Sequence, residues 1–114
     1  MIELLSNTGY IMYNKIIARS LGVNEAIMIG ELCQVALQNS EDEFCITQNK
    51  IEADTGLSPY QQRKAMASLM EERIATKERR GSPSQNFYRI NRNGLYGAIE
   101  KFEQMEAQRS GLLF

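Results

Sequence analysis

Residues 57–91 read "LSPYQQRKAMASLMEERIATKERRGSPSQNFYRIN", and this stretch decides which fold we expect for the chain. It opens with a helix start, because Ser58 and Gln61 have the spacing of a capping box, in which two side chains satisfy free backbone N–H groups. Pro59 suits the first helical position, where a missing N–H does no harm. We predict a helix from there to about Arg73.

The predicted helix has a buried face and an exposed face. Apolar side chains recur at intervals of three and four residues, which places them on one side of a helix. The side expected to be buried carries Gln62, Ala65, Met66, Leu69 and Arg73. The exposed side carries Tyr60, Gln61, Arg63, Lys64, Ala67 and Ser68.

A β-hairpin is predicted within residues 74–91. The segments "IATKER" and "FYRIN" consist of short runs that suit strands, and the turn-forming residues of "RGSPSQN" separate them. Because side chains alternate along a strand, Tyr88 and Ile90 should lie on one side of the hairpin. Phe87 and Arg89 should lie on the other side.

Two helices and a strand are predicted at shorter signals upstream. The spacing of apolar residues over 11–21 predicts a short amphipathic helix, which Gly22 should end in a left-handed conformation. The apolar residues 44–46, "FCI", predict a short strand. Thr47 should then cap a two-turn helix that ends at Gly56.

A long helix is predicted from Glu25 to about Gln38, with Asn24 as its cap and Val23 packed against Met28. It is apolar around most of its circumference. Its narrow polar stripe consists of Glu31, Gln34 and Gln38. Such a helix needs cover on more than one side, so it is either a central core helix or partly covered by a second subunit.

The order of these elements is that of a winged helix-turn-helix, in which a recognition helix follows a tight turn and a hairpin forms the wing. The predicted class is therefore mainly α with a small β-hairpin, plus an added N-terminal helix. Residues 1–114 should form a single domain with its core at 24–92 and a C-terminal amphipathic helix at about 93–109. The stripe of that helix is Leu95, Ala98, Ile99, Phe102 and Met105. The apolar end "GLLF" has no predicted place.

The charge of the chain is strongly polarised, although its net value is only −1. Residues 1–59 carry three cations and eight anions, a net charge of −5. Residues 60–92 carry eight cations and three anions, a net charge of +5, and the remainder carries −1. The positive third coincides with the predicted recognition helix and wing, where phosphate binding would need it.

Double-stranded DNA is therefore the expected partner. Glutamine can pair with adenine edges in the major groove, and arginine or lysine with guanine edges. Hydroxyls and free N–H groups at helix N-termini suit phosphate oxygens, and a wing can follow the backbone or the minor groove. The alternative for each residue is an ordinary solvated side chain. The candidates are Thr47, Gln48, Ser58, Tyr60, Gln61, Arg63, Lys64, Lys77, Arg79, Arg80, Ser82, Ser84, Gln85 and Asn86.

Residues 44–91, "FCITQNKIEADTGLSPYQQRKAMASLMEERIATKERRGSPSQNFYRIN", resemble the winged-helix N-terminal domains of phage replication initiators. These replisome organizers are related to the DnaD-type primosome proteins of Gram-positive bacteria. Upstream, "IMYNKIIARSLGVNEAIMIGEL" resembles their lead-in, so the similarity covers about 10–92. Arg73 stands where such domains often have glycine, which would place a side chain at a left-handed position.

Other classes of function have little support in the sequence. The chain has no His, and Cys33 and Cys45 are expected to be buried, reduced thiols. Neither a carboxylate constellation nor a Gly-rich phosphate loop is recognisable, so we expect no enzyme, no metal and no cofactor. The N-terminus does not resemble a secretory signal, and no apolar run approaches the about 20 residues of a membrane span. A cytoplasmic protein without a membrane partner is expected.

Three roles remain open for such a fold. The resemblance favours sequence-specific DNA binding in replication initiation of a phage or mobile element. A transcriptional regulator with the same fold is the alternative, and a protein–protein oligomerisation module of a replisome is another. We expect a homodimer or higher oligomer, because palindromic sites favour two-fold symmetry, with replisome proteins as candidate partners.

Overall fold

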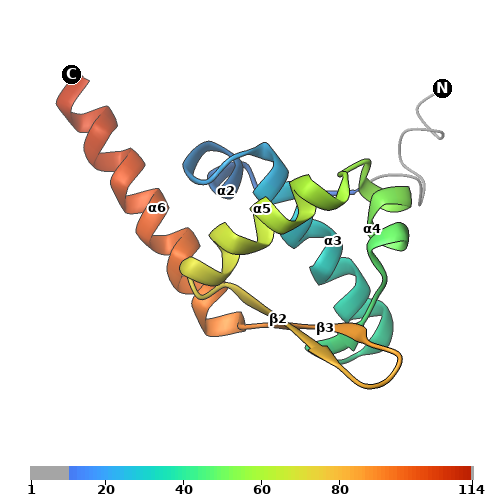
Figure 1. Cartoon of the computed structure of the whole chain (residues 1–114). Helices are drawn as coiled ribbons and strands as arrows, with labels where there is room; N and C mark the ends of the chain where they lie inside the picture. Colours follow the sequence, from blue (N-terminus) through green and yellow to red (C-terminus); the bar gives the residue numbers. More distant parts are fainter. Residues whose placement is uncertain (1–10, 114) are drawn as a thin grey trace, which may run out of the picture.

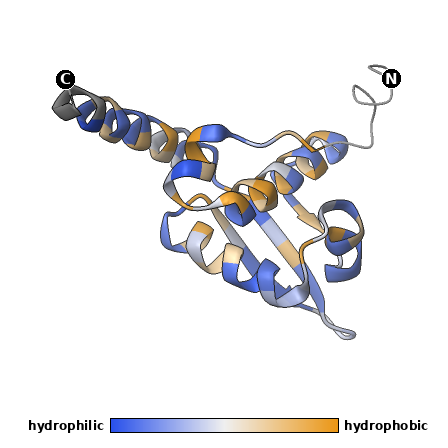
Figure 2. Cartoon of the chain, turned by 90° about the horizontal axis from the view of Figure 1, so that it is seen from above, coloured by the Kyte–Doolittle hydropathy of each residue, from blue (hydrophilic) through white to orange (hydrophobic). Residues whose placement is uncertain are grey.

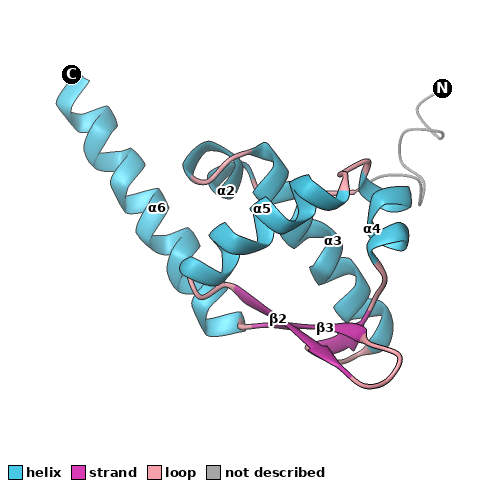
Figure 3. Cartoon of the chain, in the orientation of Figure 1, coloured by secondary structure: helices cyan, strands magenta, loops and turns pink. Residues whose placement is uncertain are grey.

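The computed structural model of the chain describes the backbone of residues 11–113 and the side chains up to residue 109. Five helices and a small sheet make up this region, and the sheet lies below the helices in the view of Figure 1 and Figure 3. The elements are α2 Lys15–Ser20, α3 Val23–Asn39, β1 Glu43–Cys45, α4 Gln48–Thr55, α5 Pro59–Glu71, β2 Ala75–Arg80, β3 Gln85–Ile90 and α6 Arg92–Leu113.

The predicted winged helix-turn-helix is confirmed. Helices α4 and α5 form the helix-turn-helix over α3, and β2 and β3 form the wing beneath them (Figure 1). The sheet is antiparallel with the order β1-β3-β2. The predicted strand at 44–46 corresponds to β1, which adds a strand to the hairpin by pairing with β3. Phe44 lies opposite Tyr88 in this pairing, and their stacked rings have centres 6.2 Å apart. Strand β1 leads directly into α4 along the chain.

The local signals at the helix-turn-helix are borne out residue by residue. The N–H of Lys50 donates to the hydroxyl of Thr47 at 3.0 Å, which caps α4. Gly56 ends α4 with φ 80°, a conformation that favours glycine. The capping box at α5 is complete, because the N–H of Gln61 donates to Ser58 Oγ at 3.2 Å and the N–H of Ser58 donates to Gln61 Oε1 at 2.9 Å.

The start of α3 differs from the prediction. The helix begins at Val23, because the carbonyl of Gly22 already accepts from the N–H of Ala26 at 3.1 Å. Asn24 therefore lies inside the helix rather than at its cap, and Val23, predicted to pack against Met28, is 54% exposed. Gly22 has φ 133° and ψ 159° rather than a left-handed helical conformation. The cap position of α3 is thus taken by Gly22, which has no side chain to accept a hydrogen bond.

Helix α2 is also shorter than the predicted 11–21. Asn14 caps it by accepting from the N–H of Ile17 at 3.0 Å, and Leu21 ends it in a right-handed conformation. Asn14 stops the helix from extending upstream because its side chain caps the free N–H of Ile17 in the first turn.

The core confirms α3 as the central helix. Its buried side chains pack against α2, α5 and the sheet. The expected faces of α5 and β3 are borne out except at Arg73, which was placed on the buried face of the helix but is exposed, because α5 already ends at Glu71. The predicted polar stripe of α3 is wrong at Glu31, which is only 2% exposed because it faces α4. Cys45 is exposed rather than buried, because it lies on the outer side of β1, and Cys33 is half-buried.

Helix α6 leaves the domain from a tight junction. Arg73 has φ 60°, so the left-handed position expected there does carry a side chain. The amide of Asn91 donates to the carbonyl of Arg73 at 2.9 Å and accepts from the N–H of Gly94 at 3.1 Å. Glu106 of α6 still forms an ion pair with Arg19 of α2, and the C-terminal part of α6 extends away from the other elements (Figure 2). Met105, predicted within the apolar stripe of this helix, is half-exposed. The end "GLLF" lies outside the residues whose side chains are described.

Candidate nucleic-acid interface

The exposed face of α5 presents the predicted recognition residues to solvent. Tyr60 is 60% exposed, and Arg63 and Lys64 are exposed on the same first two turns. The ammonium of Lys64 lies 5.7 Å from the centre of the Tyr60 ring, a cation–π contact. This part of α5 therefore offers an aromatic ring and two cations at the end of the helix that would enter a groove.

Gln61 is less free than the sequence predicts. Its amide oxygen accepts from the N–H of Ser58 in the capping box, which leaves its NH₂ group to contact a ligand. A bidentate pairing with adenine needs both the oxygen and the nitrogen of the amide. Gln61 can therefore pair with adenine in that way only if the cap opens.

Gln62 holds the two helices of the motif together. It is 2% exposed, and its Nε2 donates to the carbonyl of Gln48 at 3.1 Å and to that of Leu57 at 2.9 Å. The first carbonyl belongs to α4 and the second to the turn before α5. The sequence placed Gln62 on the buried face but contained no signal for this role.

Strand alternation divides the cations of the wing between two sides. In the register of β2 and β3, Lys77 lies opposite Tyr88 and Arg79 lies opposite Asn86. Both cations are therefore on the side of the sheet that faces the helices. Burial lowers the pKa of Lys77, and the positive charges of Arg79 and Arg63 lower it further. Arg63 belongs to α5, so the cations of the helix and the wing lie close enough to repel one another.

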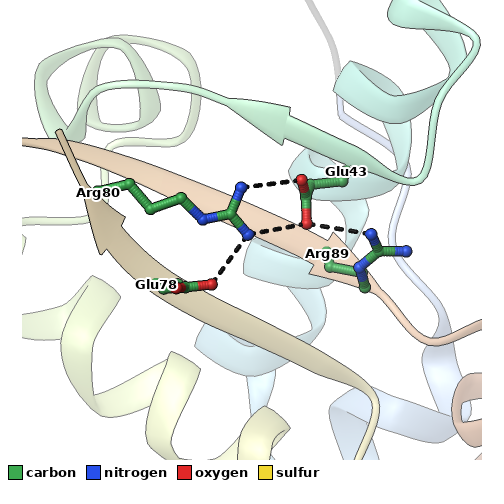
Figure 4. A network of polar contacts seen from close by, with 4 residues as sticks. All are labelled: Glu43, Glu78, Arg80 and Arg89. Atoms are coloured by element: carbon green, nitrogen blue, oxygen red, sulfur yellow. Dashed lines mark hydrogen bonds and ion pairs between the residues drawn. The ribbon is translucent and has the colours of Figure 1, made fainter.

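Arg80 lies on the other side of the wing and is occupied by carboxylates of the chain (Figure 4). Its guanidinium forms two hydrogen bonds of 3.1 Å to Glu43 and one of 2.9 Å to Glu78, and it stacks 4.7 Å from the Phe87 ring centre. Arg89 joins Glu43 at 3.1 Å. These hydrogen bonds raise the pKa of Arg80 and lower the pKa of Glu43.

The predicted positive third of the chain is therefore only partly available. Arg92 is also paired, with Asp42 at 2.9 Å. Four cations of this segment lie on α5 or on the side of the wing that faces α5. Within the described part of the chain these four form no ion pair: Arg63, Lys64, Lys77 and Arg79. Arg80 and Arg89, by contrast, lie on the other side of the wing and pair with Glu43. Fewer cations are therefore free than the sequence suggests.

Most of the remaining candidates gather at the wing tip. Thr47 and Gln48 at the start of α4 lie opposite the end of the wing across a polar hollow of about 280 Å³. The wing contributes Ser84, Gln85 and Asn86 to the same hollow. Ser82 is exposed in the turn of the hairpin and Ser58 is half-buried at the cap of α5, and neither lines the hollow.

The comparisons with known proteins show the fold. No protein-family model matches the chain, and no curated protein sequence matches it. A solved structure described as the N-terminal domain of a DNA-binding protein is similar, with a TM-score of 0.53 and 18% sequence identity over 90% of each chain. The chain has a winged-helix fold. None of its described helices has the length and apolarity that crossing a membrane requires.

Proposed function

We propose that this protein binds double-stranded DNA through α5 and the wing, in a binding rather than a catalytic role. The observation that carries the proposal is the group of cations that Arg63, Lys77 and Arg79 form between the helix and the wing. Their mutual repulsion is not relieved by carboxylates of the described residues, so a phosphate backbone would supply the missing charge. The similar solved structure, described as part of a DNA-binding protein, supports the same role.

The exposed start of α5 would enter the major groove. Arg63 and Lys64 would pair with guanine edges, and Tyr60 would pack against the sugar or a thymine methyl. Lys77 and Arg79 would contact phosphates. The polar hollow beside Thr47 would hold another phosphate group against the polar groups that line it. The proposal leaves out Arg80, because two carboxylates already satisfy its guanidinium.

Titration of labelled duplexes at several salt concentrations tests this proposal. A random duplex pool, from which bound sequences are selected, reveals the preferred site. The variant Lys64→Ala should bind all duplexes but discriminate less between the selected site and unrelated ones, since it would remove a base contact. Absence of binding to any duplex at low salt would refute the proposal.

We further propose that the DNA site belongs to replication initiation in a phage or mobile element, with the protein in the cytoplasm. The support is the resemblance of residues 44–91 to replisome organizers. A selected site that maps to a replication origin would agree with this proposal. A site that maps to a promoter would instead indicate the transcriptional alternative.

A homodimer is also proposed, through an apolar groove of about 520 Å³ between α3, α6 and the segment before α2. The described residues that line it carry no charge, so a second copy suits it better than DNA or a charged peptide. Leu37 at its rim is 81% exposed. In sedimentation, Leu37→Glu should give monomers while Gln38→Glu, on the exposed neighbouring position, should not. A monomeric wild type at high micromolar concentration would contradict this, whereas a tight oligomer without DNA binding would favour the oligomerisation module.

A further inference from the structure

A buried carboxyl group lies between α3 and α4. Glu31 of α3 is 98% buried, since its relative exposure is 2%. Its Oε2 has no hydrogen-bond donor among the described N–H and O–H groups. An ionised carboxylate in that position would be desolvated and unsatisfied, which is strongly unfavourable.

The partner of Glu31 is another carboxyl group. Asp54, near the end of α4, lines the same hollow as Glu31, and its Oδ1 accepts from the ammonium of Lys50 at 2.9 Å. A hollow of about 510 Å³ adjoins the pair, and β1 contributes the Cys45 thiol to it. Its other described lining residues are uncharged: Ile11, Gln34, Val35, Gln38, Ile46 and Ala53. The charged groups that face Glu31 are therefore Asp54 and Lys50, both from α4.

This arrangement is satisfied when Glu31 is neutral. Burial, together with the hydrogen-bonding oxygens and the negative charge of the neighbouring Asp54, raises the pKa of Glu31 to about 8. The pKa of Asp54 is lowered, because it accepts hydrogen bonds from Glu31 and Lys50. A neutral Glu31 has a hydroxyl that it can donate to the Asp54 carboxylate, and the Lys50 ammonium also donates to that carboxylate.

We propose that Glu31 and Asp54 share one proton across the contact of α3 with α4, and that this proton fastens the first helix of the helix-turn-helix. Gln62 holds the start of α4 through the carbonyl of Gln48, while the shared proton holds its last turn. Loss of the proton in mildly alkaline solution leaves two like charges across the contact and loosens that turn. Any effect on DNA affinity rests on the proposed function, but the effect on α4 does not.

The direct test follows the Glu31 carboxyl carbon by NMR in the full chain between pH 4 and 10. We expect Glu31 to titrate well above pH 6.5 and the amide signals of α4 near Asp54 to shift with it. A Glu31 titration near its ordinary value would overturn the proposal. This measurement uses the wild type and does not depend on any variant folding.

A second test compares the stability of the wild type, Glu31→Gln and Glu52→Gln. Glu52 is an exposed residue of α4 and serves as the control. Native Glu31 binds its proton more tightly than the unfolded chain does. The folding equilibrium constant of the wild type should therefore fall about tenfold per pH unit relative to Glu31→Gln between about pH 5 and 8, and run parallel above that range. Glu52→Gln should follow the wild type. Parallel wild-type and Glu31→Gln profiles throughout would contradict the shared proton.

Duplex binding provides a third readout. Wild-type affinity should decrease between pH 7 and 9, and that of Glu31→Gln should stay constant over the same range. Constant wild-type affinity together with a high Glu31 titration would overturn the link from the proton to the recognition surface. If no duplex binds at any pH, the proposed function fails. The NMR and stability results would still show whether Glu31 and Asp54 share a proton.

Discussion

Replacement of Gln62 by methionine should weaken the fold through two specific hydrogen bonds. Methionine has a similar length and suits the buried face of α5, so the packing is largely kept. The carbonyls of Gln48 and Leu57 would each lose the donor that Gln62 provides at 3.1 and 2.9 Å. The substitution therefore isolates the polar contribution of one buried side chain.

The expected loss in the free energy of unfolding is about 2 kcal/mol, from about 1 kcal/mol for each buried hydrogen bond that is removed. Part of the desolvation penalty of the two carbonyls is offset, because Gln62 Oε1 is itself buried without a donor among the described residues and disappears with the substitution. A loss of that size should lower the melting temperature of a domain this long by about 8 °C.

Denaturant unfolding followed by circular dichroism measures this loss. Gln38→Met, at an exposed position of α3, is the matched control and should leave the stability within about 0.5 kcal/mol of the wild type. If Gln62→Met were as stable as that control, Gln62 would not be what joins α4 to α5.

Two other predictions concern the α6 junction and the outer side of the wing. Gly94→Ala should destabilise the protein by about 2 kcal/mol, because a Cβ would collide with the carbonyl of Arg73, whereas Gly97→Ala should stabilise it by up to about 1 kcal/mol, since that position is open. Thermal melts of both variants check this, and equal effects would contradict it. Arg80 holds the pKa of Glu43 below its usual value. The ion pair of Arg80 with Glu43 therefore stabilises the fold above pH 4.5, and this stabilisation is lost as the pH falls further. Melts of Arg80→Gln below pH 5 should therefore show a weaker acid dependence than those of the wild type.

The features that could be predicted from the sequence are those set by neighbouring residues. The capping box at Ser58, the cap at Thr47 and the left-handed turn at Gly56 each depend on a few consecutive positions. Strand alternation likewise predicted which side of β3 is buried. These local signals were enough to predict the order of the helices and strands. That order was enough to predict the winged-helix fold.

The features that were missed depend on residues far apart in the chain. Arg80 belongs to the positive segment, but its partner Glu43 is 37 positions away and meets it only when β1 joins the sheet. Glu31 looked like part of a solvated stripe because nothing in its own helix shows that α4 covers it. A count of charges along the sequence cannot distinguish paired from free cations, since pairing follows from the sheet register.

The adjacent residues Arg79 and Arg80 allow the DNA-binding proposal to be tested within one strand. They differ by one position, yet Arg79 lies on the side of α5 and Arg80 is paired with Glu43 and Glu78. The decisive measurement is the slope of log affinity against log salt concentration for Arg79→Gln and Arg80→Gln on the same duplex. Arg79→Gln should reduce the magnitude of the slope by about 0.9, the value of one phosphate contact, while Arg80→Gln should leave it unchanged. Equal slopes for both variants, or a larger change for Arg80→Gln, would show that the surface between α5 and the wing is not where DNA binds.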